Sequence, residues 1–369
     1  MTAPGSRSAF RVLALDGGGM RGLYTAIVLQ RLATHFAGRQ VSDHAPPDPG
    51  KAFDLIVGTS TGAILAAVLA AGRPLDRIVA LYKSAGPLIF PSPSPIGARN
   101  ILWCLLHWRR PSADADALRH ALLAELGNET FGELYARRGI WLCLTASNLR
   151  TLTPRVFGTP SSARPADADA SVVDACVASC AAPILFPPSA LPVQSSGADP
   201  VLCDGGLWAG NPALLALLVA LEACAPEQEI QLLSAGSAPL TGALQPDARP
   251  RKAGIGHWIR GLRLMQASLD VHAVATTDLT RRLAPHLSRR VRVARLLDTG
   301  LETGDTMAVR MDDPSPAALA RTEGLAAQAA DANARASQDP ASELALLQEI
   351  FSCAPSSKTP QSLQAGGSS

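Results

Sequence analysis

The chain has 369 residues, of which 47% are hydrophobic and 17% are charged, so it is long and apolar enough to bury a sizeable core. Its 33 basic and 31 acidic residues leave a formal charge of +2, which argues against the concentrated positive field that DNA binding requires. We expect no DNA partner.

The beginning of the chain and the cysteines indicate the class of protein. The first residues lack the apolar region and cleavage site of a secretory signal, and the longest apolar runs, 63–72 and 212–221, are about half as long as a membrane span. The seven cysteines are irregularly spaced without paired CxxC motifs, which favours reduced buried thiols over zinc ligands. We therefore expect a cytoplasmic protein that needs no metal and no other cofactor.

The chain opens with two units of strand, glycine-containing turn and helix, each identified by an apolar run and then by apolar residues at helical spacing. In the first unit the strand is 10–15, the turn 16–19 and the helix 23–36. In the second the strand is 53–57, the turn 58–62 and the helix 63–71. Consecutive units of this kind place their strands in a parallel sheet covered by helices. The pattern therefore predicts an α/β fold, a three-layer sandwich with a mainly parallel central sheet flanked by helices.

The rest of the chain continues the sheet after an interruption. Residues 86–130 are irregular and rich in proline, leucine, tryptophan and arginine, which indicates an insertion or lid outside the sheet. Further strands are predicted at 140–145, 201–203, 230–234 and 291–297, with helices at 172–182 and from Pro212, after the N-cap Asn211. From residue 254 the chain is mostly helical, and the polar, glycine-rich residues 354–369 are expected to be a disordered tail. We expect residues 8–352 to form one domain.

Residues Gly58–Gly62, Gly-Thr-Ser-Thr-Gly, fit the pattern G-x-S-x-G between a predicted strand and an alanine-rich helix. A serine hydroxyl becomes a strong nucleophile when a base accepts its proton and its Oγ is held against the substrate. A sharp strand-to-helix turn holds the oxygen, and the flanking glycines give the backbone room. The pentapeptide is short enough to arise by chance, but its position predicts that Ser60 is a nucleophile.

The first predicted strand is followed by Asp16-Gly17-Gly18-Gly19-Met20-Arg21-Gly22. Successive glycines at such a turn expose backbone N–H groups, which bind a phosphate or stabilise the oxyanion of an acyl-transfer intermediate. The chain has neither the GxGxxG nor the GxxxxGK[ST] phosphate-binding pattern. Because a serine turn lies on the next strand–helix unit, we interpret Gly17, Gly18 and Gly19 as oxyanion donors. A tight turn without a catalytic role is the alternative.

The base that activates Ser60 is not an obvious histidine. None of the seven histidines lies in a recognisable turn at a strand end, although a Ser-His-Asp triad using His257 or His272 stays an alternative. Asp204 ends a predicted strand and precedes two glycines, which places it at the carboxyl edge of the sheet. A carboxylate there can accept the Ser60 proton directly if a dry pocket raises its pKa.

These three motifs in this order, Asp-Gly-Gly-Gly-Met-Arg-Gly, Gly-Thr-Ser-Thr-Gly and Asp-Gly-Gly, resemble those of the patatin-like phospholipase family over about residues 10–236. The resemblance implies a dyad of Ser60 and Asp204 with an oxyanion hole at Gly17–Gly19. It implies an acyl hydrolase of phospholipase A or lysophospholipase type, whose substrates are carboxylic esters of membrane phospholipids. Arg21 takes the family's basic position after the glycines, where it binds a lipid phosphate or braces the turn.

The length of the chain and its helical C-terminal part also resemble bacterial cyclic-nucleotide-activated phospholipases of anti-phage defence, in residues 53–91 and 266–330. This second resemblance implies a cyclic di- or oligonucleotide activator. Six arginines cluster where an anionic ligand could dock, although a solvated basic face explains them as well: Arg281, Arg282, Arg289, Arg290, Arg292 and Arg295.

Residues 88–111 contain Trp103 and Trp108 among leucines, followed by Arg109 and Arg110. Tryptophan beside arginine is typical of a membrane interface, whereas the same residues also suit a helix packed on the body of the protein. We expect peripheral contact with the inner face of the membrane and leave a homo-oligomer open. A catalytically inactive homologue whose glycine turn binds an anion is the remaining alternative.

Overall fold

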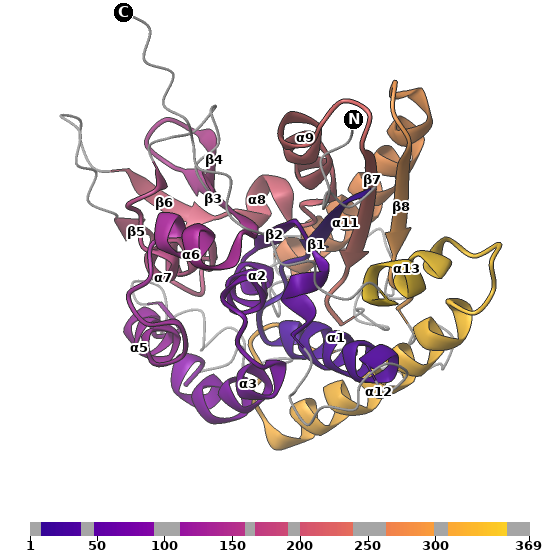
Figure 1. Ribbon diagram of the computed structural model, residues 1–369. Helices are drawn as coiled ribbons and strands as arrows, with labels where there is room; N and C mark the ends of the chain where they lie inside the picture. The colour runs from indigo at the N-terminus through magenta and orange to yellow at the C-terminus, as the bar shows by residue number, and fades with distance from the viewer. Residues whose placement is uncertain are drawn as a thin grey trace, which may run out of the picture.

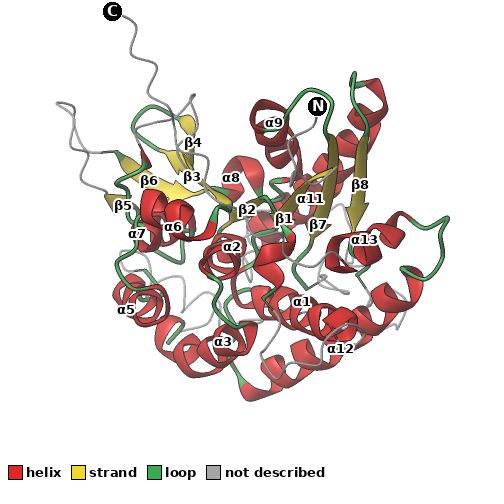
Figure 2. Ribbon diagram, in the orientation of Figure 1, coloured by secondary structure: helices red, strands yellow, loops and turns green. Residues whose placement is uncertain are grey.

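The computed structural model describes residues 9–37, 48–91, 111–158, 167–190, 200–238, 263–298 and 309–352. Within these residues the chain forms one eight-stranded sheet with helices on both faces (Figures 1 and 2). The predicted α/β class, with a mainly parallel sheet between layers of helices, is confirmed.

The sheet has the strand order β5-β6-β3-β2-β1-β7-β8, and β4 pairs with β3. Its strands are β1 (Ala9–Leu15), β2 (Leu55–Thr59), β3 (Trp141–Asn148), β4 (Thr153–Gly158), β5 (Ser189–Ala190), β6 (Val201–Asp204), β7 (Glu229–Ala235) and β8 (Val291–Arg295). The five strands from β3 to β8 along this order are parallel, whereas β4, β5 and β6 are antiparallel to their neighbours.

The helices bury the two faces of the sheet unequally. They are α1 (Gly22–Ala37), α2 (Thr61–Ala71), α3 (Leu75–Ile89), α5 (Ala115–Leu126), α6 (Phe131–Arg138), α7 (Val172–Ser179), α8 (Gly206–Ala209), α9 (Ala213–Ala223), α11 (Arg263–Leu283), α12 (Pro316–Ala336) and α13 (Leu346–Ser352). Leu13 and Leu15 of β1 point into the larger core, which α1, α2, α3, α5, α7 and α12 complete. The alternate residues Val12 and Ala14 face α9 on the other side. This alternation is that of a strand covered on both faces.

Several predicted elements differ from those in the structure. Helix α7 ends at Ser179 rather than at Ala182. The segment 86–130 is not irregular throughout, because it contains the end of α3 and the whole of α5, whose Leu118 and Leu122 are buried in the core. Residues 92–110 lie outside the described residues, and they hold the middle of the predicted lid 86–130 and most of the tryptophan–arginine segment 88–111. The predicted tail 354–369 lies outside them as well.

Two expectations about the class of protein concern cysteines and membrane spans. The five cysteines in the described ranges are all free and buried, as expected for reduced thiols: Cys143, Cys176, Cys180, Cys203 and Cys224. None of the described helices combines the length and the hydropathy that a membrane crossing requires.

Candidate active site

Ser60 lies on a strained turn between β2 and α2. Its backbone has φ 54° and ψ −125°, a conformation that costs a residue other than glycine about 1–3 kcal/mol. The turn is possible because the residues two positions before and after Ser60 are glycines, Gly58 and Gly62. A Cβ atom at Gly62 would collide with the backbone carbonyl of Leu15, so the helix can approach β1 this closely only without a side chain there. The predicted strand–turn–helix context of Ser60 is therefore present.

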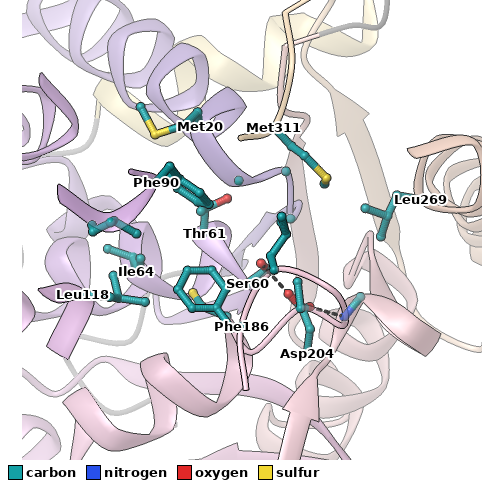
Figure 3. A pocket seen from close by; sticks show the side chains of 18 of the residues that line it. Met20, Ser60, Thr61, Ile64, Phe90, Leu118, Phe186, Asp204, Leu269 and Met311 are labelled. Atoms are coloured by element: carbon teal, nitrogen blue, oxygen red, sulfur yellow. Dashed lines mark hydrogen bonds between the residues drawn. The ribbon is translucent and has the colours of Figure 1, made fainter. Parts of the chain in front are cut away.

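Asp204 reaches Ser60 because two strands meet end to end. Strand β4 pairs with β3 along Cys143–Asn148, so β2 and β6 share the opposite edge of β3. The last residue of β2, Thr59, pairs with Thr145, and Asp204 pairs with the next residue, Ala146. The Ser60 hydroxyl donates a hydrogen bond of 2.7 Å to Oδ2 of Asp204 (Figure 3). The two residues that the sequence singled out therefore lie side by side.

The Asp204 carboxyl is buried, with 6% of the residue exposed. Its Oδ1 accepts a hydrogen bond of 2.6 Å from the Gly206 N–H, so both oxygens are held (Figure 3). Burial raises the pKa of Asp204 to about 6, against the opposing effect of the hydrogen bonds from Gly206 and Ser60. At neutral pH the group is mainly ionised, yet it is a better proton acceptor than an exposed aspartate.

The glycine turn after β1 offers two free N–H groups. The Gly17 N–H donates to the carbonyl of Gly210 over 3.0 Å, so this N–H already has an acceptor within the protein, and the role of Gly17 as an oxyanion donor stays a prediction. Within the described part of the chain, the N–H groups of Gly18 and Gly19 have no hydrogen-bond acceptor, and both residues line the cavity beside Ser60. Gly19 has φ +60°, which favours glycine, and the next N–H, that of Met20, donates to the Met311 carbonyl.

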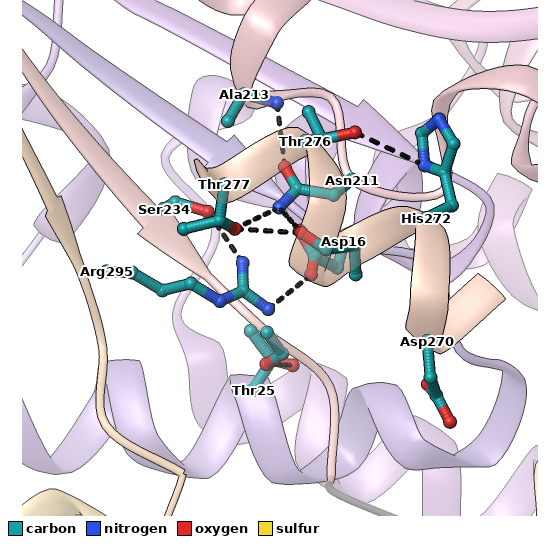
Figure 4. Close-up of polar contacts among 12 residues, drawn as sticks. Asp16, Thr25, Asn211, Ala213, Ser234, Asp270, His272, Thr276, Thr277 and Arg295 are labelled. Atoms are coloured by element: carbon teal, nitrogen blue, oxygen red, sulfur yellow. Dashed lines mark hydrogen bonds and ion pairs between the residues drawn. The ribbon is translucent and has the colours of Figure 1, made fainter. Parts of the chain in front are cut away.

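Asp16, at the start of this turn, belongs to a buried ion pair. Its Oδ2 accepts a hydrogen bond of 2.7 Å from Arg295 of β8, and Arg295 also donates to the Ser234 hydroxyl (Figure 4). The Asp16 N–H donates to the Ala235 carbonyl of β7. Burial raises the pKa of Asp16, and the Arg295 guanidinium opposes that effect. These contacts attach the glycine turn to the two strands at the far edge of the sheet.

Arg21 is buried under the glycine turn and contacts other parts of the protein. It is 1% exposed, and its guanidinium donates to the carbonyls of Gly18 and Ala238 and pairs with Asp270 at 3.3 Å. It is not among the residues that line the cavity. Of the two roles that the sequence left open, these contacts favour the structural one over binding of a lipid phosphate.

The six arginines between residues 281 and 295 do not form a free basic patch. Each contacts an acidic side chain or other protein acceptor: Arg281 with Glu343, Arg282 with Asp278, Arg289 with Cys224 and the Ala225 carbonyl, Arg290 with Glu229, Arg292 with Glu349, and Arg295 with Asp16. The predicted docking of an anionic ligand on this cluster is therefore not supported.

A cavity of about 540 Å³ opens against Ser60 and Asp204. Its apolar lining comes from α2, α3, α5 and the segment after α7, and includes Ile64, Leu81, Phe90, Leu118 and Phe186 (Figure 3). This volume lies within the range of about 300–1,000 Å³ that is usual for ligand pockets. The cavity is therefore large enough and apolar enough to take the acyl chain of a lipid.

The described histidines do not complete a triad. None of them lines the cavity or hydrogen-bonds Ser60, and His272 contacts Thr276 instead (Figure 4). His257 lies outside the described residues. The sequence reasoning did miss a third group at the site, the segment after α7. Cys180 of this segment lines the cavity, and its neighbours contact the backbone of Ser60 and Asp204.

Comparison with known proteins places this site in a family. Residues 13–217, which include the glycine turn, Ser60 and Asp204, match the patatin-like phospholipase family. A Pseudomonas aeruginosa protein named cGAMP-activated phospholipase is 35% identical over 69% of this chain and 69% of its own length. A Vibrio cholerae protein of the same name is 30% identical, over 76% and 79%. Patatin-like protein 4 of Arabidopsis thaliana is 30% identical over 56% of this chain and 51% of its own length. The chain is therefore a member of the patatin-like phospholipase family.

Proposed function

We propose that the chain is a lipid acyl hydrolase of phospholipase A or lysophospholipase type that works through a dyad of Ser60 and Asp204. The observation that carries the proposal is the hydrogen bond of 2.7 Å between the Ser60 hydroxyl and the buried Asp204 carboxylate, in the wall of an apolar cavity. The pair provides a nucleophile and a base, and the cavity beside it provides room for an acyl chain.

The reaction has two halves. Ser60 Oγ attacks the ester carbonyl carbon while Asp204 Oδ2 takes the hydroxyl proton, and the N–H groups of Gly18 and Gly19 stabilise the oxyanion. The C–O bond then breaks, and the leaving alcohol takes the proton from Asp204. In the second half, water attacks the acyl-Ser60 ester and gives its proton to Asp204. Breaking that ester releases the fatty acid and returns the proton to Ser60.

We also propose that a cyclic nucleotide activates the enzyme, as the names of the Pseudomonas and Vibrio relatives state for those proteins. The test is mass spectrometry of the products formed from mixed bacterial lipids, with and without cGAMP, with Ser60→Ala as the blank. Free fatty acid that depends on Ser60 supports the hydrolase, and its increase with cGAMP supports activation. Equal release in both conditions would remove the activation proposal alone.

The pH profile tests the role of Asp204. Because the base has to be unprotonated and the Asp204 pKa is about 6, kcat/KM is expected to fall about tenfold per pH unit below that value. Above about pH 7 it should be level. The measurement is kcat/KM with a soluble ester from pH 4.5 to 8.5. A midpoint that moves on His272→Ala would instead point to a histidine base.

Replacement of Gly19 by alanine tests the oxyanion hole. A Cβ atom at this position would meet the Met311 backbone, and φ +60° disfavours any residue with a side chain. The displaced turn should lower kcat by about 10²–10³-fold, the usual cost of losing an oxyanion donor. Gly324→Ala is the matched control, because nothing lies within 4 Å of a Cβ atom there. If Gly19→Ala kept the wild-type kcat, Gly19 would have no part in the oxyanion hole.

We propose that the mouth of the cavity contacts the membrane surface. Ile184 and Leu207 line the cavity and yet are 61% and 57% exposed. Ile184 has φ 75°, which a β-branched residue rarely adopts. Exposed apolar residues beside a lipid site suit contact with the acyl region of a bilayer.

Substitution of the two exposed residues at the cavity mouth is expected to slow hydrolysis of membrane lipids without slowing the chemical step. The double variant Ile184→Glu/Leu207→Glu should hydrolyse phospholipid vesicles about tenfold more slowly, because two charges enter the apolar contact, while a soluble short-chain ester is cleaved at the wild-type rate. Leu152→Glu is the control, since Leu152 is 83% exposed and does not line the cavity. An equal loss on both substrates would contradict the membrane role.

A further inference from the structure

We propose that the three residues from Ser179 to Ala181, here called the dyad brace, hold Ser60 and Asp204 at hydrogen-bonding distance. The brace begins at the last residue of α7, and neither the three sequence motifs nor the mechanism above uses it. The inference rests on the proposed function for its kinetic test, but not for its geometry.

The brace contacts both members of the dyad. The Ser60 N–H donates a hydrogen bond of 2.8 Å to the Ser179 hydroxyl oxygen. The Asp204 N–H donates one of 3.0 Å to the Ala181 carbonyl. Between these two contacts, Cys180 lines the cavity together with Ser60 and Asp204. The two ends of this three-residue segment therefore bind the backbone of the nucleophile and the backbone of the base.

Ser60 needs such a partner because of its backbone conformation. With φ 54°, Ser60 lies between the last residue of β2 and the first residue of α2, and its N–H bonds the Ser179 hydroxyl rather than a neighbouring strand. A buried N–H without an acceptor is unfavourable, so the Ser179 hydroxyl stabilises the strained conformation directly. Ser179 is itself fully buried, which keeps water from taking its place.

Asp204 needs a partner because its strand is short. Strand β6 has four residues, and only Leu202, Cys203 and Asp204 pair with β3. The bond to Ala181 adds an anchor at the end of the strand, next to the carboxylate. Helix α7 packs on α2, β3 and β6, so one rigid element supports both positions. The O–O distance of the dyad is thus set by α7 as well as by the sheet.

Ser179 is a positioning residue, because it does not line the cavity and contacts the backbone of Ser60 rather than substrate. Ser179→Ala is expected to lower kcat about 10- to 100-fold through misplacement of the Ser60 oxygen, with KM unchanged. Ser179→Thr keeps a hydroxyl and should recover part of the rate.

Ser337→Ala is the matched control. Ser337 is also a buried serine, 1% exposed, whose hydroxyl bonds a backbone carbonyl, that of Ala334, outside the cavity lining. It should lose stability with an unchanged kcat. If Ser179→Ala does not fold, Ser179→Cys leaves no void, because its thiol is slightly larger than the hydroxyl, and offers a poorer acceptor; it is compared instead.

The closing experiment measures the rate at which a fluorophosphonate probe labels Ser60 in the wild type, Ser179→Ala and Ser337→Ala. Slower labelling of Ser179→Ala alone, together with the kcat loss, supports the brace. Equal labelling rates, or a rise in KM at constant kcat, would overturn it. Labelled wild type without lipid products would overturn the proposed substrate and leave the brace standing, whereas wild type that does not label would overturn both.

Discussion

Asp204→Asn is expected to lower kcat by about 10³-fold, within the range that general-base catalysis contributes. The amide keeps the shape of the carboxyl and can still accept the Gly206 N–H, but it does not take the Ser60 proton. The dyad geometry is thereby preserved while the base is removed. The measurement is kcat on a lipid ester together with the rate of fluorophosphonate labelling, and both should fall.

Two variants control for this result. Asp278→Asn makes the same change at a surface residue that pairs with Arg282, and should keep full activity. His272→Ala removes the described histidine that the triad alternative would use, and should also be active. An active Asp204→Asn enzyme would contradict the dyad. A His272→Ala enzyme that folds but has no activity would favour the Ser-His-Asp triad instead.

Ser60 and Asp204 could both be predicted from sequence because each has local signals. Ser60 lies between an apolar run and an alanine-rich helix, and Asp204 precedes a pair of glycines at a strand end. Their contact could not be predicted by the same means. It depends on β6 running antiparallel to β3 and meeting the end of β2, and such a register is set by pairing between segments far apart in the chain.

The glycine turn shows a second limit of sequence reasoning. Three consecutive glycines predict exposed N–H groups, but the pattern does not say which of them the protein itself occupies. Gly210, from the loop between α8 and α9, accepts the Gly17 N–H. Arg21 is similar, since its partners Ala238 and Asp270 are both distant in sequence. The partners of both residues are tertiary contacts, which a local pattern does not reveal.

Helix α5 was missed although its signals are local. Leu118, Leu122 and Leu126 recur at four-residue spacing on its buried face. Asp114 caps its first turn by accepting the Ala117 N–H, and Gly127 follows its end. The proline-rich residues just before this helix made the whole of 86–130 look irregular. The prediction of an irregular segment rested on the proline-rich composition before the helix and did not weigh the helical pattern within 115–126.

Arg295→Met is expected to lower the free energy of unfolding by about 3–5 kcal/mol, because it leaves the buried Asp16 carboxylate without its cation. The side chains of this pair are 16% and 4% exposed, so solvent replaces little of the lost interaction. Urea titration of the wild type and the variant gives the difference directly. The matched control is Arg282→Met, whose ion pair is 77% and 55% exposed and should contribute at most about 1 kcal/mol.

The double variant Arg295→Met/Asp16→Asn separates two effects: the cost of an unpaired buried charge, and the loss of the contact that holds the glycine turn. Removing both charges should restore much of the stability, because no unpaired ion is left in the core. Activity should stay below wild type, since Asp16 directly precedes the glycine turn and Arg295 attaches it to β7 and β8. Arg295 lies outside residues 13–217, so this pair connects the C-terminal part of the chain to the glycine turn. A double variant with wild-type kcat would show that the pair contributes to stability alone. A stable Arg295→Met protein would show that the Asp16 carboxylate takes up a proton or finds another cation when Arg295 is absent.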